Sequence, residues 1–499
     1  MSKAVASAVD YVAVHARLNG ARVAAVDLTR ARQWTYAEFD DWIARMCAAL
    51  RRRGIKRGDR VAALAKNRPG LVALHHACAR LGVMFVPLNW RLAPPELAWL
   101  VRDCAPRILL GDPGLLAAAS LEGEDIDAFE AALASERPFT RVAVKAHLPS
   151  LLLYTSGTSG HPKGAQLTEN NLRETAINFS LLGNVDADSV VLCDAPMFHV
   201  IGLVTNVRPV FLRGGTILVS DGFEPSRSLA RLADPQLKIT HYFCVPQMAA
   251  QLRRVATYNP NALSGLKAIF TGGAPHPAAN IRAFLADGVT VVDGYGLSEA
   301  GTVFGMPIDR ALIDRHAGSV GVAAPTVETK IVDANGKVCP ANVAGELLLR
   351  GANIAKGYWG RPDATADAFA EGGWFRTGDI VLANEEGFHW IVDRKKDMFI
   401  SGGENVYPVE IEAALAARAD IRECAVIGAP DPQWGEVGVL FIAANEGAAI
   451  EADAVRADLS KLLARFKVPK HVLMVDALPR NGAGKVLKST LRDWARARL

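Results

Sequence analysis

The sequence predicts an α/β fold with a large layered N-terminal domain and a small α+β domain at the C-terminal end. In the first four-fifths of the chain, short apolar runs alternate with helical patterns, and three runs lead directly into glycine-rich sequence. The pattern changes near residue 393. A chain of 499 residues, half of them hydrophobic, also exceeds one compact core, so two or more domains are expected.

The three apolar runs predict strands, and each ends at glycines. Ser150–Tyr154 precedes TSGTSG, Lys267–Phe270 precedes TGGAP, and Val289–Val292 precedes DGYG. Ligands of α/β domains commonly bind where strands end in loops. We therefore expect the functional site at these three junctions.

The C-terminal domain is predicted to span 395–499, after an N-terminal domain of 1–394. Pro408–Leu415 predicts a helix, and Cys424–Ile427 and Val439–Ile442 predict strands. A further helix with one apolar face is indicated by helical spacing of Val455, Leu459, Leu462 and Phe466. The charged cluster 393–397 predicts an exposed linker between the domains.

Composition excludes several classes of protein. The net charge is +4 and acidic and basic residues nearly balance, so no nucleic-acid partner is implied. The cysteines number 7 and include no Cys-x-x-Cys, which argues against a disulfide framework or a structural zinc site and fits a reducing compartment. No signal-peptide pattern and no apolar run of ~18 residues occurs, so we expect a cytoplasmic protein without a transmembrane segment. A homodimer is left open.

The strongest anion-binding signal is YTSGTSGHPK, residues 154–163. Glycines let backbone N–H groups converge on phosphate oxygens, and Lys163 adds a positive charge. The loop does not fit the Walker pattern, so a P-loop fold is disfavoured. The residues expected to contact phosphate with hydroxyl groups or backbone are Thr155, Ser156, Gly157, Thr158, Ser159 and Gly160.

This loop resembles the signature loop of the AMP-forming adenylating enzymes, which include acyl-CoA synthetases, peptide-synthetase adenylation domains and firefly luciferases. Matching motifs run in family order from Tyr154 to Lys485, and among members the chain looks most like bacterial long-chain-fatty-acid–CoA ligases. The resemblance implies an adenylation domain, a mobile C-terminal domain, and the use of ATP, Mg²⁺, coenzyme A and a carboxylic acid.

The motif DGYGLSEAG, residues 293–301, carries the expected metal ligand. Glu299 offers the hard oxygen that Mg²⁺ prefers, although a carboxylate at a helix N-terminus is the simpler alternative. The resemblance implies that Glu299 binds the metal, Ser298 contacts phosphate, and Tyr295 lies by the adenine. The nucleotide set also includes Asp293, Gly294 and Gly296, with Gly272 and Gly273 of TGGAP on the adenine side.

The ribose is assigned by resemblance to WFRTGD, residues 374–379. A carboxylate after a glycine turn can accept both ribose hydroxyls, so Asp379 is expected to bind them, together with Arg394. Alone, Asp379 would be read as a turn-forming aspartate.

The segment APMFHVIGL, residues 195–203, borders the acyl site in the resemblance. Peptide-synthetase domains commonly place Asp where this chain has His199, which argues against an amino-acid substrate. Two readings of His199 stay open: a buried, hydrogen-bonded histidine, or a residue that lines or gates the pocket. Arg208 is the nearest candidate reader of a second carboxylate, unless it faces outward.

The C-terminal motifs imply a domain that rotates between two half-reactions. Lys396 matches the hinge, Gly402 and Gly403 match the glycines of the pantetheine tunnel, and Lys485 of PRNGAGK matches the lysine that stabilises charge during adenylation. Alone, the glycines would be a turn and Lys485 a solvated surface charge.

The prediction is a two-step ligase that forms acyl-AMP and then acyl-CoA. A medium- or long-chain fatty acid is the expected substrate, and an aryl or cinnamic acid of the feruloyl type is the alternative. An adenylase that loads a carrier-protein thiol and a luciferase-like oxygenase are rivals. A non-catalytic nucleotide binder is disfavoured by the simultaneous presence of Lys163, Glu299, Asp379, Arg394 and Lys485.

Overall fold

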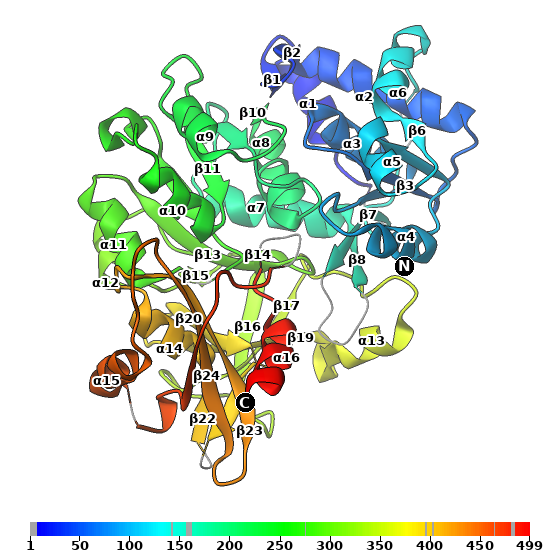
Figure 1. The fold of residues 1–499 in the computed structure, drawn as a ribbon. Helices are drawn as coiled ribbons and strands as arrows, with labels where there is room; N and C mark the ends of the chain where they lie inside the picture. Colours follow the sequence, from blue (N-terminus) through cyan, green and yellow to red (C-terminus); the bar gives the residue numbers. More distant parts are fainter. Residues whose placement is uncertain are drawn as a thin grey trace.

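The computed structural model confirms the predicted fold class, a large α/β N-terminal part followed by a small C-terminal part (Figure 1). It describes residues 7–140, 143–155, 162–274, 276–394, 397–401, 404–463, 465–480 and 485–499.

The longest sheet holds nine strands within the described chain and is parallel through its centre, with β2, β14 and β15 antiparallel at its two edges. Its spatial order is β15 (Val322–Ala323), β14 (Gly301–Gly305), β13 (Val291–Leu297), β12 (Ala268–Thr271), β11 (His241–Cys244), β9 (Val190–Cys193), β10 (Thr216–Val219), β1 (Val23–Asp27) and β2 (Arg32–Thr35).

A second sheet, of six strands among the described residues, is also parallel except for its last strand. Its order is β6 (Glu124–Asp125), β5 (Ile108–Gly111), β3 (Arg60–Leu64), β4 (Met84–Pro87), β7 (Pro149–Thr155) and β8 (Lys163–Thr168). Parallel strands require crossover connections, and helices supply most of them here.

Helices surround both sheets in Figure 1. They are α1 (Tyr11–Leu18), α2 (Tyr36–Arg52), α3 (Pro69–Leu81), α4 (Pro94–Cys104), α5 (Pro113–Ala118), α6 (Ile126–Ala132), α7 (Glu169–Leu182), α8 (Arg208–Arg213), α9 (Pro225–Leu232), α10 (Pro246–Arg254), α11 (Ala278–Ala286), α12 (Arg310–Arg315) and α13 (Pro362–Asp367). The start of α7 illustrates the local cause. Thr168 and Asn171 form a reciprocal capping box that satisfies two backbone N–H groups.

An antiparallel sheet completes the N-terminal part, and a separate sheet, antiparallel except for its parallel β24–β25 pair, forms the core of the C-terminal part. The first contains β16 (Val327–Val332), β17 (Gly345–Gly351), β18 (Phe369–Ala370), β19 (Trp374–Ala383) and β20 (His389–Arg394). The second contains β21 (Phe399–Ser401), β22 (Glu404–Val406), β23 (Ile421–Asp431), β24 (Gly435–Ala444) and β25 (His471–Met474), packed with α14 (Pro408–Leu415), α15 (Ala452–Leu462) and α16 (Lys488–Arg498). The long β23–β24 hairpin is visible at the bottom of Figure 1.

Three sequence predictions differ from the structure in detail. The DGYG run is not a loop, because β13 continues through it to Leu297. Leu462 and Phe466 do not join the apolar face of Val455 and Leu459, because α15 ends at Leu462, and both side chains are exposed. The linker prediction was wrong for Asp397, which is buried and pairs with Arg492 at 3.0 Å.

The glycines of DGYG explain why a strand can pass there. Antiparallel β14 approaches β13 so closely that a Cβ at Gly296 would lie 2.2 Å from the carbonyl oxygen of Gly301. A Cβ at Gly294 would lie 3.0 Å from the carbonyl oxygen of Phe304. Glycine is therefore required for the backbone approach and not for a turn.

Within the described ranges, no helix combines the length and apolarity that crossing a membrane requires.

Candidate functional site

The ends of β12 and β13 bring the TGGAP and DGYG motifs side by side. The hydroxyl of Thr271 donates to Oδ1 of Asp293 at 2.9 Å, and both residues are buried. Burial raises the pKa of Asp293 to about 8. A Cβ at Gly272 would lie 3.1 Å from the carbonyl oxygen of Gly294, and Gly273 has φ +82°. The two motifs predicted for the adenine thus form one contiguous backbone surface.

Tyr295 and Asp379 meet at the junction of two sheets. The hydroxyl of Tyr295 donates to Oδ2 of Asp379 at 2.5 Å, and Asp379 is buried. Its backbone N–H donates to Oγ1 of Thr377 at 3.0 Å, which holds the backbone at this position. In the ladder of β19 and β20, Asp379 lies opposite Arg394. The structure therefore places Tyr295, predicted for the adenine, beside Asp379, predicted for the ribose. The backbone of Arg394, also predicted for the ribose, lies opposite Asp379.

A third group joins Glu299 to the start of β8 through Tyr358. The hydroxyl of Tyr358 donates to Oε1 of Glu299 at 2.9 Å, and Nζ of Lys163 lies 5.4 Å from the centre of the Tyr358 ring. This attraction between a cation and an aromatic ring brings the lysine and the carboxylate to one side chain.

The backbone of residues 355–359 holds this group in place. The N–H of Ala355 donates to the carbonyl oxygen of Glu299 at 2.6 Å, and the N–H of Trp359 donates to Gly164 at 2.8 Å. Sequence reasoning missed Tyr358. Its signal was only a glycine followed by two aromatic residues, and such a pattern also fits an ordinary packed loop.

The donor set around Glu299 fits a metal that arrives with a nucleotide. Among the described residues, no cluster of three or more His, Cys, Asp or Glu side chains forms a metal cage. Mg²⁺ commonly takes one or two carboxylates and completes its shell with phosphates and waters. The single half-buried carboxylate of Glu299, next to half-buried Ser298, fits that pattern.

His199 is half-buried beside the ring of Phe198, which together with Trp90 forms an aromatic wall. Burial lowers its pKa to about 4, so the ring is neutral, and its Nε2 has no hydrogen-bond partner in the described part of the chain. The rings of Phe198 and His199 are 4.6 Å apart, and Trp90 meets Phe198 edge-on at 6.2 Å. The guanidinium of Arg91 lies over both Trp90 and Phe198. Of the two open readings, the hydrogen-bonded histidine gains no support at Nε2, and the lining or gating role stays a prediction.

Arg208 faces inward, and its charge is already balanced. Its guanidinium donates to both carboxylate oxygens of Glu169, at 2.9 and 3.0 Å, and lies 3.0 Å from Nε2 of His75. The hydroxyl of Ser150 donates to the same carboxylate at 2.5 Å. An arginine paired in this way is unsuited to recognising a second substrate carboxylate.

Several predicted residues fall outside the described ranges: Ser156, Gly157, Thr158, Ser159, Gly160, Lys396, Gly402 and Gly403. Thr155 ends β7, and its hydroxyl donates to the carbonyl oxygen of Lys163 at 3.3 Å. Lys485 is exposed.

Comparison with known proteins agrees with this geometry. The AMP-binding enzyme model matches residues 12–359, and the model of its C-terminal domain matches residues 410–485. A feruloyl-CoA synthase from Amycolatopsis sp is 38% identical over 464 residues, covering 92% of this chain and 93% of the relative. The long-chain-fatty-acid–CoA ligase FadD13 from Mycobacterium tuberculosis is 34% identical over 475 residues, covering 92% of each chain.

The ATP-bound structure of MatB from Rhodopseudomonas palustris superimposes with a TM-score of 0.89 at 31% identity, covering 97% of this chain and 99% of that one. Both family models, the relatives and the fold therefore agree on one chemistry. The chain belongs to the AMP-binding enzyme family and is an AMP-forming acid–CoA ligase that uses ATP and coenzyme A.

Proposed function

We propose that the acid is an aryl-substituted carboxylic acid of the cinnamic type. The supporting observation is the aromatic wall of Trp90 and Phe198 next to neutral His199. Aromatic side chains favour edge-to-face and offset contacts with another ring, each worth about 0.5–1.5 kcal/mol beyond area burial. The similarity to a feruloyl-CoA synthase points the same way.

A medium- or long-chain fatty acid is the second candidate. It is favoured by the 34% identity to FadD13 and by the resemblance of the motifs to fatty-acid ligases. The two candidates differ in shape, because a flexible chain needs a long apolar channel and a planar ring needs a short slot.

In the proposed first half-reaction, a carboxylate oxygen of the acid attacks the α-phosphorus of ATP. The new P–O bond forms as the bond to pyrophosphate breaks. Tyr295 and Asp379 hold adenine and ribose, with Arg394 at the ribose as well. Lys163 and the hydroxyls of the loop before it hold the phosphates, and Lys485 balances negative charge at the carboxylate and α-phosphate.

Magnesium would be held by Glu299, where it neutralises charge on the departing pyrophosphate. Tyr358 is proposed to orient Glu299 through the 2.9 Å hydrogen bond, so that one carboxylate oxygen keeps a defined direction.

In the proposed second half-reaction, the thiol sulfur of coenzyme A attacks the acyl carbon. A C–S bond forms, the C–O bond to AMP breaks, and the thiol proton leaves to solvent. Between the two steps the domain 395–499 would rotate about Lys396, which withdraws Lys485 and brings Gly402 and Gly403 to the thiol's path.

A panel of acids scored by CoA-dependent AMP release tests the substrate proposal. The panel contains ferulate, benzoate, octanoate, palmitate, acetate and malonate, and reactions without coenzyme A are the control. We expect the highest kcat/KM for ferulate. A highest kcat/KM for palmitate or octanoate would replace the aryl proposal with the fatty-acid candidate.

A further inference from the structure

We propose that Asn67 is a positioning residue that fixes the backbone of residues 195–197 and so sets where the acid is held beside Phe198 and His199. This rests on the proposed function in one respect, the placement of the acyl site at residues 195–203. It does not depend on which acid is the substrate.

Asn67 joins two segments that come from different sheets. It follows β3 of the six-stranded sheet, while the segment 195–199 follows β9 of the nine-stranded sheet. Its Nδ2 donates to the carbonyl oxygen of Ala195 at 2.8 Å, and its Oδ1 accepts from the N–H of Met197 at 2.9 Å. The amide thus satisfies one acceptor and one donor of a single turn of backbone.

These bonds lie where water cannot replace them. Asn67 is 4% exposed, and Ala195 and Met197 are also buried. A buried backbone group that loses its partner bears the full cost of desolvation. Removing the Asn67 amide would therefore take from the turn at 195–197 the partner of one carbonyl oxygen and of one N–H group.

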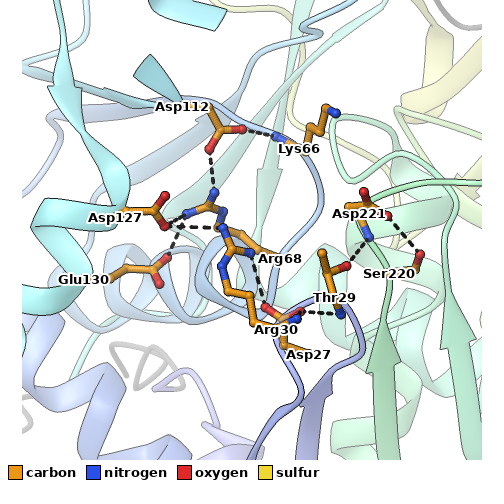
Figure 2. A network of polar contacts seen from close by, with 10 residues as sticks. All are labelled: Asp27, Thr29, Arg30, Lys66, Arg68, Asp112, Asp127, Glu130, Ser220 and Asp221. Atoms are coloured by element: carbon orange, nitrogen blue, oxygen red, sulfur yellow. Dashed lines mark hydrogen bonds and ion pairs between the residues drawn. The ribbon is translucent and has the colours of Figure 1, made fainter. Parts of the chain in front are cut away.

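The backbone that carries Asn67 is itself clamped by an ion cluster, shown in Figure 2. The guanidinium of Arg68 contacts Asp112 at 2.5 Å, Asp127 at 2.7 Å and Glu130 at 3.8 Å. The N–H of Lys66 donates to Oδ2 of Asp112 at 2.9 Å. Lys66 is thus tied to the residue that follows β5, and Arg68 is tied to that residue and to α6. These contacts fix the backbone from which the Asn67 amide extends.

The residue that directly precedes the acyl segment is tied to the nine-stranded sheet. Asp194 accepts from the hydroxyl of Ser228 at 2.6 Å and from that of Tyr242 at 3.0 Å. Trp90 packs on Phe198, on the other side of the turn. Between Asp194 and Phe198, the side-chain hydrogen bonds to residues 195 and 197 among the described residues come from Asn67. The contacts of the nucleotide motifs, Thr271 with Asp293 and Tyr295 with Asp379, involve other elements. A change at Asn67 should therefore affect the acid more than ATP.

The test replaces Asn67 with leucine, which keeps the approximate shape and removes both hydrogen bonds, and with serine as a smaller polar variant. Acid-dependent ATP–pyrophosphate exchange is measured with whichever acid has the highest kcat/KM in the panel. We expect N67L to raise the KM for the acid by roughly ten-fold while the KM for ATP stays within about two-fold. N67S should show the same split to a smaller extent.

The matched control is Asn178→Ala. Asn178 is also buried, donates to the carbonyl oxygen of Thr302 at 3.4 Å and accepts from the N–H of Thr326 at 3.2 Å. It should lower thermal stability without separating the two KM values.

The proposal would be overturned by an unchanged KM for the acid in N67L, or by equal increases in the KM values for the acid and ATP. It would also be overturned by loss of AMP binding in both Asn67 variants, since Asn67 would then be a general stabiliser of the domain. The panel judges the substrate class separately, because the Asn67 experiment runs with any acid that the wild-type enzyme accepts.

Discussion

Tyr358→Phe removes a single hydroxyl that donates to Oε1 of Glu299 at 2.9 Å and leaves the ring over which Lys163 lies. Hydrogen bonds to charged groups contribute about 1.5–3 kcal/mol, and Glu299 is only half-buried, so the low end applies. A loss of ~1.5 kcal/mol lowers a rate constant about ten-fold. If the bond orients the proposed metal ligand, this loss should fall on adenylation alone.

The two half-reactions can be measured separately, adenylation by ATP–pyrophosphate exchange and thioester formation from synthetic acyl-AMP. We expect Y358F to slow the first about ten-fold and to change the second less than about two-fold. Tyr258→Phe is the matched control, because its hydroxyl donates to Oδ2 of Asp287 at 3.0 Å outside the site motifs. Y258F should change neither step. Equal losses in both steps, or exchange at the wild-type rate in Y358F, would refute the orienting role.

Three further predictions use the same assays or a thermal melt. Glu299→Gln should impair exchange more than thioester formation, and equal losses would remove the metal role. Lys485→Ala should lower exchange by ~100- to 1,000-fold and spare thioester formation, since a lost transition-state donor costs about 2.7–4 kcal/mol; activity in both steps would make it an ordinary surface lysine. Burial raises the pKa of Glu130 to about 7, above its unfolded value, so the folded state binds the proton more tightly and stability falls as pH rises through that interval. Glu130→Gln should therefore raise Tm at pH 8 more than at pH 5, and an equal change at both pH values would count against the raised pKa of Glu130.

Local sequence determined the elements and the motifs of this protein. The helix Pro408–Leu415 and the strand that contains Ser150–Tyr154 occur where propensity, apolar spacing and turn residues agree, since each depends on neighbours in the chain. The adjacency of TGGAP and DGYG was expected from the rule that ligands gather at strand ends, and β12 and β13 are neighbours in the sheet.

Only the tertiary structure decided which side chains meet. Tyr358 reaches Glu299 across 59 residues, Asn67 reaches Ala195 across 128, and Arg208 turns inward because Glu169 neutralises it. Leu462 remains exposed although its spacing predicts a buried face, because the helix ends there. Periodicity reports which face of an element is apolar, but it holds no information about the partner on another element. That partner is set by how the sheets pack, and the packing depends on the whole chain at once.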